Sequence, residues 1–237
     1  MLPGGSMDAT LSMTGKQLNA ATLEKEVAWF KAVVQARFDL YFERETDISE
    51  IYAINAPDLS SDRSEYAQIV RESGMSFDER LIVILALLPH VQPQALDLFL
   101  MSNQDLARGF TEFGGWRGKY HSGFLPTCET AVFILAGDNL AKRFEVLQLL
   151  QTDDNLSKHG IIKVAQAVNG EPFLSAALTS TAEYLGRMTT GKSQKPDYTM
   201  HFPAKLITTS LTGATGRTGH GPRRHDHPRR RKTLRQN

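Results

Sequence analysis

Residues 76–88 read Ser-Phe-Asp-Glu-Arg-Leu-Ile-Val-Ile-Leu-Ala-Leu-Leu. The Ser76 hydroxyl can accept a hydrogen bond from the backbone N–H of Glu79, and the glutamate can reach back to the serine N–H, so the segment predicts a capping box. The helix that follows is apolar on every side, which predicts burial at the centre of a core. Its apolar run, residues 81–88, is the longest in the chain and falls short of the roughly 18–20 residues that cross a bilayer. We therefore expect no membrane segment.

Upstream, residues 18–42 carry apolar residues at intervals of three and four, which predicts a long amphipathic helix. Its apolar stripe either packs on the rest of the chain or forms a coiled-coil or oligomer seam. The stripe consists of Leu23, Val27, Phe30, Val34, Phe38 and Tyr41.

Between this helix and the central one, two shorter helices are expected. The first covers residues 48–54 and is capped by Asp47. The polar residues 55–62 predict a linker. The second helix covers residues 63–73 and is ended by Gly74, because glycine readily adopts the left-handed backbone that follows a helix.

Three more helices are expected after the central one. Pro93 suits the first turn of a helix that runs to about Met101. After a glycine-rich connector, Thr127 is expected to cap a helix that ends at Gly137. A further helix covers residues 140–150.

The pattern then changes to the alternation that is typical of strands. Residues 161–168 and 173–178 flank Asn-Gly-Glu-Pro at 169–172, which predicts a β-hairpin. Helices followed by a hairpin are the order of a winged-helix domain, so residues 75–190 are the candidate for one. The expected fold class is mainly α with a small β-hairpin (α+β), in which a helical N-terminal segment precedes the winged-helix-like domain.

The net charge of +1 conceals a division between an acidic body and a basic tail. Residues 213–237 hold seven Arg and one Lys against Asp226, a net of +7, which leaves −6 on residues 1–212. The expected segments are 1–15, a disordered or vector-derived start in which either Met1 or Met7 begins the protein; 16–60, the long helix and a linker; 61–191, the winged-helix-like domain; 192–212, a second linker; and 213–237, a disordered basic tail.

One phosphate-loop string is present, since residues 186–193 fit G-x-x-x-x-G-K-[ST] through Gly186, Gly191, Lys192 and Ser193. Its chemistry requires a strand that enters the loop and a helix that leaves it. Here a second capping box at Ser180 predicts a helix entering, and Lys-Pro at 195–196 prevents a useful helix from leaving. We interpret the string as a chance match and expect no cofactor site.

Nucleic-acid recognition would need basic residues on the reading helix. The third helix, residues 128–136, has one acid and neither Arg nor Lys, so the domain is expected to bind protein in preference to DNA. The loop around residues 114–123 is either an ordinary surface loop or a partner contact. Its candidate contact residues are Trp116, Arg117, Lys119, Tyr120 and His121.

Neither a catalytic residue nor a metal site is expected. Cys128 is interpreted as a packing residue, and as the one cysteine it fits a reducing, cytoplasmic compartment. His220, His225 and His227 could chelate a metal in isolation, but a basic disordered tail is the preferred interpretation.

Several of these segments together resemble a known family. Residues 76–89, 113–115, 121–127 and 129–131 resemble the N-terminal part of AAA+ ATPases that are encoded with bacterial contractile injection systems. The resemblance continues through 173–178 and 184–185 and ends at 202–212, which looks like the lead-in to the ATPase module. It therefore covers about residues 16–212.

The resemblance implies a parent protein that hydrolyses ATP to remodel or disassemble the injection particle. This region would be its non-catalytic partner-binding or regulatory part, with protein partners that include other copies in the parent hexamer. ATP and magnesium would bind only in an ATPase module beyond Thr212, so no catalytic residue is carried over. Residues 213–237 resemble GC-rich DNA read out of frame, which suggests a frameshift. The alternative is a freestanding winged-helix protein that binds nucleic acid through the basic tail.

Overall fold

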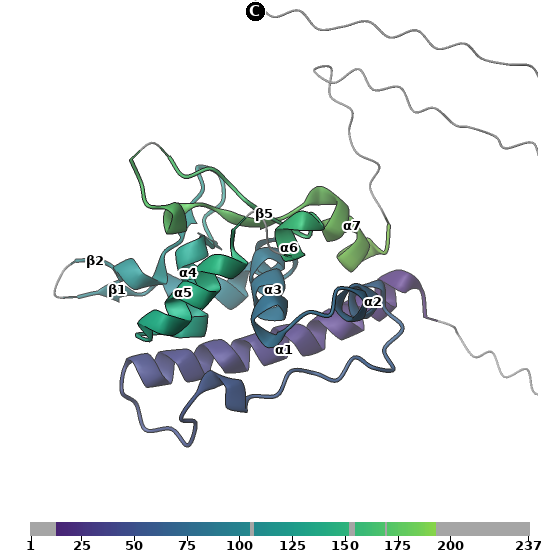
Figure 1. The fold of residues 1–237 in the computed structure, drawn as a ribbon, viewed down its shortest axis with the longest axis horizontal. Coiled ribbons are helices and arrows are strands. Elements are labelled where there is room, and N and C mark those ends of the chain that lie inside the picture. Colours follow the sequence, from purple (N-terminus) through teal and green to yellow (C-terminus); the bar gives the residue numbers. More distant parts are fainter. Residues whose placement is uncertain (1–12, 105–106, 152–154, 169, 193–237) are drawn as a thin grey trace, which may run out of the picture. The chain divides into compact units, whose positions relative to one another are not determined.

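The structure of the chain, a computed structural model, describes residues 13–104, 107–151, 155–168 and 170–192 (Figure 1). As the sequence predicted, this part is mainly helical (α+β), but it contains three small antiparallel strand pairs where one hairpin was expected. The expectations for 1–12 and for 193–237 fall outside the described residues.

The α-helices are α1 (Gly15–Tyr41), α2 (Glu65–Glu72), α3 (Phe77–Val91), α4 (Cys128–Ala136), α5 (Leu140–Leu149), α6 (Asn155–Lys158) and α7 (Ala182–Thr190). The strand pairs are β1 (Ser102–Asn103) with β2 (Arg108–Gly109), β3 (Trp116–Arg117) with β4 (Phe124–Leu125), and β5 (Ile162–Val164) with β6 (Leu178–Ser180). Short 3-10 helices lie at Ile51–Ala53, Pro93–Leu100, Thr111–Phe113 and Phe173–Ser175.

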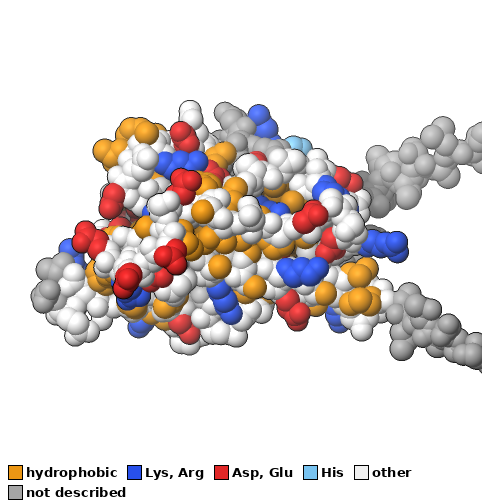
Figure 2. Space-filling model, turned by 90° about the horizontal axis from the view of Figure 1, so that it is seen from below, with side chains coloured by type: hydrophobic (Ala, Val, Ile, Leu, Met, Phe, Trp, Pro, Cys, Tyr) orange, Lys and Arg blue, Asp and Glu red, His pale blue; other side chains and the backbone are white. Residues whose placement is uncertain are grey.

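The long helix α1 packs against α2, α3, α4 and α7, and it lies beneath the other α-helices in Figure 1. The first five residues of the predicted stripe are buried, and Tyr41 is partly buried against the same core. The stripe therefore packs within the chain. Figure 2 shows the molecule from the side of α1, where Lys and Arg (blue) and Asp and Glu (red) are interspersed among apolar side chains (orange).

The central helix α3 begins as predicted. Ser76 N donates to Glu79 Oε2 at 2.8 Å, and Glu79 N donates to Ser76 Oγ at 3.3 Å, which completes the capping box. Every residue from 78 to 88 is buried. The helix continues past the expected end to Val91, with Pro89 inside it.

Within the described residues, no single helix is long and apolar enough to cross a bilayer. α3 meets the length and composition criteria only jointly with Pro93–Leu100, across a bend of 105°.

A buried ion pair joins α1 to α3. Arg80 Nε donates to Glu26 Oε2 at 2.7 Å, and Arg80 Nη2 donates to Glu26 Oε1 and, at 2.7 Å, to the carbonyl of Pro57. Tyr66 in α2 donates its hydroxyl proton to the same carboxylate at 2.9 Å. Glu26 is fully buried, so these donors replace the water that it loses on folding.

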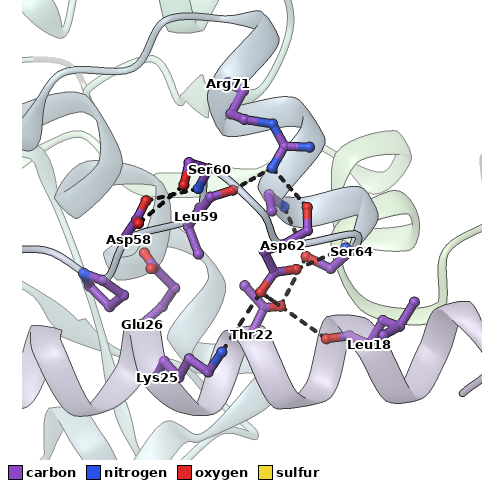
Figure 3. Close-up of polar contacts among 12 residues, drawn as sticks. Leu18, Thr22, Lys25, Glu26, Asp58, Leu59, Ser60, Asp62, Ser64 and Arg71 are labelled. Carbon is purple, nitrogen blue, oxygen red and sulfur yellow. Dashed lines mark hydrogen bonds and ion pairs between the residues drawn. The ribbon is translucent and has the colours of Figure 1, made fainter.

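The predicted linker, residues 55–62, is an ordered loop held between α1 and α2 (Figure 3). Arg71 Nη1 donates to the carbonyls of Leu59, at 2.5 Å, and Asp62, at 2.8 Å. From α1, the Thr22 hydroxyl lies 2.8 Å from Asp62 Oδ2. Helices before and after this loop share one hydrophobic core.

The prediction of a helix at 48–54 was wrong in extent. Within this segment only Ile51–Ala53 is helical, and it forms one 3-10 turn. The predicted cap is not made. Glu50, in extended backbone, occupies the N-cap position and makes no capping bond through its side chain. The helix predicted from Pro93 is likewise a 3-10 helix, ending at Leu100.

The predicted hairpin is smaller and differently joined. β5 and β6 pair antiparallel with Val164 opposite Leu178, so residues 165–177 connect them in place of the expected four-residue turn. Pro172, with φ −58°, begins the 3-10 turn Phe173–Ser175 where a strand was expected. Ser175 N donates to the Pro172 carbonyl and Ala176 N to the Phe173 carbonyl, each at 3.0 Å, so these backbone groups bond within the turn and not across a strand ladder. Asn169 of the expected turn lies outside the described residues.

On its other side, β6 contacts the segment that precedes α4. Leu178 N donates to the Pro126 carbonyl at 3.0 Å, and Cys128 N donates to the Ala176 carbonyl at 3.0 Å. Thr127 and Ala177 form an antiparallel bridge between these bonds. The segment at 126–128 therefore pairs with β6 opposite β5.

Candidate functional site

The described part of the phosphate-loop string, residues 186–192, lies at the end of α7, and Ser193 falls outside the described residues. Its first five residues are helical, and Gly191 follows with a left-handed backbone (φ 70°). Lys192 N then donates to the Gly186 carbonyl at 3.3 Å. The predicted helix before the string is confirmed, although Thr181 caps it in place of Ser180. The string presents the carbonyl end of a helix, which carries partial negative charge, whereas phosphates bind at the N–H end.

Packing against α1 and α2 holds this end of α7. Asn19 Nδ2 donates to the carbonyls of Arg187, at 2.8 Å, and Thr189, at 3.2 Å. The Asn19 Oδ1 atom accepts from Tyr66 N at 3.0 Å, and Arg187 pairs with Glu65 at 2.7 Å. These contacts give the string a structural role in the described part of the chain.

The candidate loop residues do not converge on one point. Trp116 and Arg117 form β3, and Trp116 is 49% exposed. Lys119 Nζ lies 5.2 Å from the ring centroid of Tyr120, which is 91% exposed. The Nε2 atom of His121 is buried without a hydrogen-bond partner among the described residues. Of the five, Trp116 alone lines the cleft described below.

The helix that would read DNA in the winged-helix order, residues 128–136, is α4. All its residues except Glu129 are buried, so α4 is a core helix and cannot present a reading surface. After the three-residue turn 137–139, which begins with Gly137, the chain enters α5. A short glycine-containing turn between two helices is typical of a helix-turn-helix, in which the second helix does the reading. The exposed helix at this position is therefore α5.

Two large apolar side chains of α5 face outward. Leu140 and Phe144 are 65% and 64% exposed, and residues four apart lie on one face of a helix. The opposite side of the helix packs on α4 through Val146, which is buried. We define Leu140 and Phe144 as the α5 face. The sequence analysis missed it.

The basic residues of α5 are tied to the body. Lys142 Nζ lies 2.7 Å from Asp78 Oδ2 on α3. Arg143 makes two 2.7 Å bonds to the carboxylate of Glu129 on α4. These pairs fix the rotation of α5, so the α5 face stays outward and its cations are engaged internally.

Tyr52 completes the contact at Lys142. Its hydroxyl donates to Asp78 Oδ1 at 3.0 Å, and its ring centroid lies 5.1 Å from Lys142 Nζ. Burial raises the pKa of Tyr52 to about 12, and the Asp78 charge adds to this. Burial works to lower the pKa of Lys142, but hydrogen bonds to Asp78, Tyr52 and Glu145 outweigh burial and raise it. At neutral pH the cluster is thus a neutral phenol between a carboxylate and an ammonium group.

Beside α5 lies a cleft with a volume of about 960 Å³. It is lined by residues 109–112 and 114–116 and by residues 165–168, 171–172 and 174–177, and Glu129 and Arg143 also line it. Glu112 accepts a hydrogen bond from the Tyr41 hydroxyl. Burial, followed by this hydrogen bond, raises the pKa of Tyr41 to about 12, so the donor is a neutral phenol.

Cys128 is fully buried, as its interpretation as a packing residue requires. Burial raises the pKa of its thiol to about 12 and outweighs the backbone hydrogen bond at the helix start. Among the described residues, no group of three or more His, Cys, Asp and Glu side chains is placed to hold a metal ion. The tail histidines lie outside that range.

Comparisons of the chain with models of protein families, with curated proteins and with solved structures found no match.

Proposed function

We propose that residues 13–192 form a winged-helix-like module that binds a protein partner. The order of α3, α4 and α5 followed by the β5–β6 pair supports the winged-helix assignment. The pairing of residues 126–128 with β6 supports it as well, because it joins the segment between α3 and α4 to the strand pair.

The observation that carries the proposal is the α5 face. Leu140 and Phe144 occupy the helix that would read the ligand and keep about two thirds of their surface exposed. Large exposed aromatic and aliphatic side chains gain free energy when a partner removes them from water. An apolar reading helix therefore fits a protein surface.

Nucleic acid is the weaker candidate for this helix. Binding to phosphate requires free cations, but Lys142 and Arg143 are engaged by Asp78 and Glu129. Releasing them would leave two carboxylates without their partners. DNA binding through the basic tail, residues 213–237, is the alternative.

The family resemblance supports a more specific proposal. The module would recognise a component of a contractile injection particle, or regulate an AAA+ motor that remodels it. ATP and magnesium would bind in a module encoded beyond Thr212, and the module described here would self-associate through the parent hexamer. Resequencing the gene across this junction tests the link: an intact frame that encodes residues 213–237 would contradict the frameshift.

Site-specific photo-crosslinking tests the binding function. A photoreactive amino acid is placed at position 144 of the full chain in cells of the source organism, and at the exposed position 24 of α1 as the control. We expect one protein to crosslink at 144 and not at 24, and Leu140→Ser to abolish that product. Equal products at the two positions would contradict the proposal, as would crosslinking at 144 to nucleic acid alone.

A further inference from the structure

We propose that the cleft beside α5 receives an arginine side chain from an extended segment of the protein partner. This inference rests on the proposed protein-binding function and names the chemistry of the ligand. Two segments of the chain line the cleft, 109–112 with 114–116 and 165–168 with 171–172 and 174–177, and its volume of about 960 Å³ is large enough for an arginine side chain.

The charged side chains that line the cleft carry a net negative charge. Arg143 is neutralised by its two bonds to Glu129. The carboxylate of Glu112 is bound by the Tyr41 hydroxyl, which brings no charge. Glu171 is exposed and forms no ion pair within the described part of the chain. Among the described residues, Glu112 and Glu171 thus have no cationic partner, and a cationic ligand would complement them.

The uncharged lining favours a guanidinium over an ammonium group. Phe110, Leu174 and the half-exposed Trp116 are among the lining residues. A guanidinium stacks on aromatic faces and donates to carboxylates in one plane, and it is less strongly hydrated than an ammonium group. The aliphatic stem of the arginine would cover the apolar wall. Phosphate groups, by contrast, would be repelled by Glu112 and Glu171.

The proposal predicts binding of a defined probe to the full chain. The probe is a capped heptapeptide that carries one arginine between two leucines, and its partner probe carries citrulline, which has the same shape without the charge. Binding is followed by NMR through the two tryptophan indole N–H signals. Trp116 lies at the cleft, whereas the buried Trp29 donates to the Ile54 carbonyl at 3.2 Å and serves as the internal control.

We expect the Trp116 signal to move on titration with the arginine peptide, while the Trp29 signal stays. Citrulline should weaken binding about fivefold or more. An exposed ion pair contributes up to about fivefold in affinity, so Glu112→Gln with Glu171→Gln should weaken binding about tenfold. Glu112→Gln keeps an oxygen that can accept from Tyr41. The matched control Glu24→Gln removes the same charge from the exposed side of α1 and should leave affinity within about twofold.

Three results would overturn the inference. The Trp116 signal does not move at about 5 mM peptide; citrulline binds as tightly as arginine; or Glu24→Gln weakens binding as much as the cleft variants. None of these results bears on crosslinking at position 144, so failure of the cleft proposal is distinguishable from failure of the binding function. Conversely, peptide binding at the cleft with no partner crosslinked at position 144 would support the proposed chemistry of the cleft and contradict the proposal that the α5 face binds a partner.

Discussion

Replacing Arg80 by methionine should destabilise the fold by about 3–5 kcal/mol, the usual cost of breaking a buried ion pair. The structure accounts for this size. Glu26 is fully buried and accepts two bonds from Arg80 and one from Tyr66. Arg80→Met removes two of the three donors and leaves a buried carboxylate with a single hydroxyl. Methionine retains most of the aliphatic volume, so little of the loss comes from a cavity.

Urea and thermal unfolding of the full chain, followed by circular dichroism, measure this cost. For a domain of this size, 1 kcal/mol corresponds to about 2–4 °C in Tm, so Arg80→Met should lower Tm by about 6–20 °C. The double variant Glu26→Leu with Arg80→Met removes both charges and should recover more than half of the loss. The exposed pair Arg44–Asp39 provides the control, since Arg44→Met should cost less than about 1 kcal/mol.

A loss below about 1 kcal/mol for Arg80→Met would refute the reasoning. So would a double variant that is less stable than Arg80→Met alone, because the remaining cost could not then come from an unpaired carboxylate.

Three further predictions concern Lys142, Cys128 and the phosphate-loop string. Lys142→Met should cost about 1–2 kcal/mol in urea unfolding, because Asp78 loses its ammonium partner at 2.7 Å while Tyr52 stays bonded to it. Cys128 should resist a thiol reagent at pH 8 in the folded chain and react on unfolding, since burial raises its pKa to about 12. Because the pKa of the thiol is higher in the folded chain than in the unfolded chain, the thiol contributes to stability below the unfolded pKa. This contribution should be lost as pH rises through the range from about 9 to 12. Calorimetry with ATP and magnesium should detect no micromolar binding to the chain, and Lys192→Ala should not change the result; micromolar binding that Lys192→Ala abolishes would restore the phosphate-loop reading of residues 186–193.

Features that depend on local patterns were predictable from the sequence. The capping box at Ser76 follows from neighbouring residues, and the burial of α3 follows from an apolar run that leaves no polar side to face water. The stripe of α1 was predictable from apolar residues at intervals of three and four, and its packing within the chain was one of two alternatives that the sequence left open. The strand pair was predicted, but its joining was not, because residues 173–175 form a 3-10 turn where alternation favoured a strand.

Long-range polar contacts were not predictable. Glu26 precedes Val27 of the apolar stripe of α1. The sequence alone does not reveal that Arg80, 54 positions later, supplies the counter-charge of Glu26. The 55–62 segment was polar enough to suggest a linker, but Arg71 and Thr22 hold it in place. Such pairings depend on which elements meet in three dimensions.

The candidate site was missed for a related reason. The order of helices in the sequence made 128–136 the candidate reader, whereas α4 is buried and α5 exposes Leu140 and Phe144. The i, i+4 spacing of Leu140 and Phe144 was visible in the sequence, but it equally predicts a buried stripe. Exposure distinguishes the two cases, and exposure depends on Lys142 and Arg143 turning the other side of α5 inward.

The most direct test of partner binding is the affinity of the protein that crosslinks at position 144, measured by calorimetry against Phe144→Ala. Phe144 is 64% exposed, so this change should leave Tm within about 2 °C. As a central aromatic contact, it should contribute about 2 kcal/mol, which is roughly a thirtyfold change in Kd. Unchanged affinity in a folded Phe144→Ala variant would contradict the assignment of α5 as the binding helix.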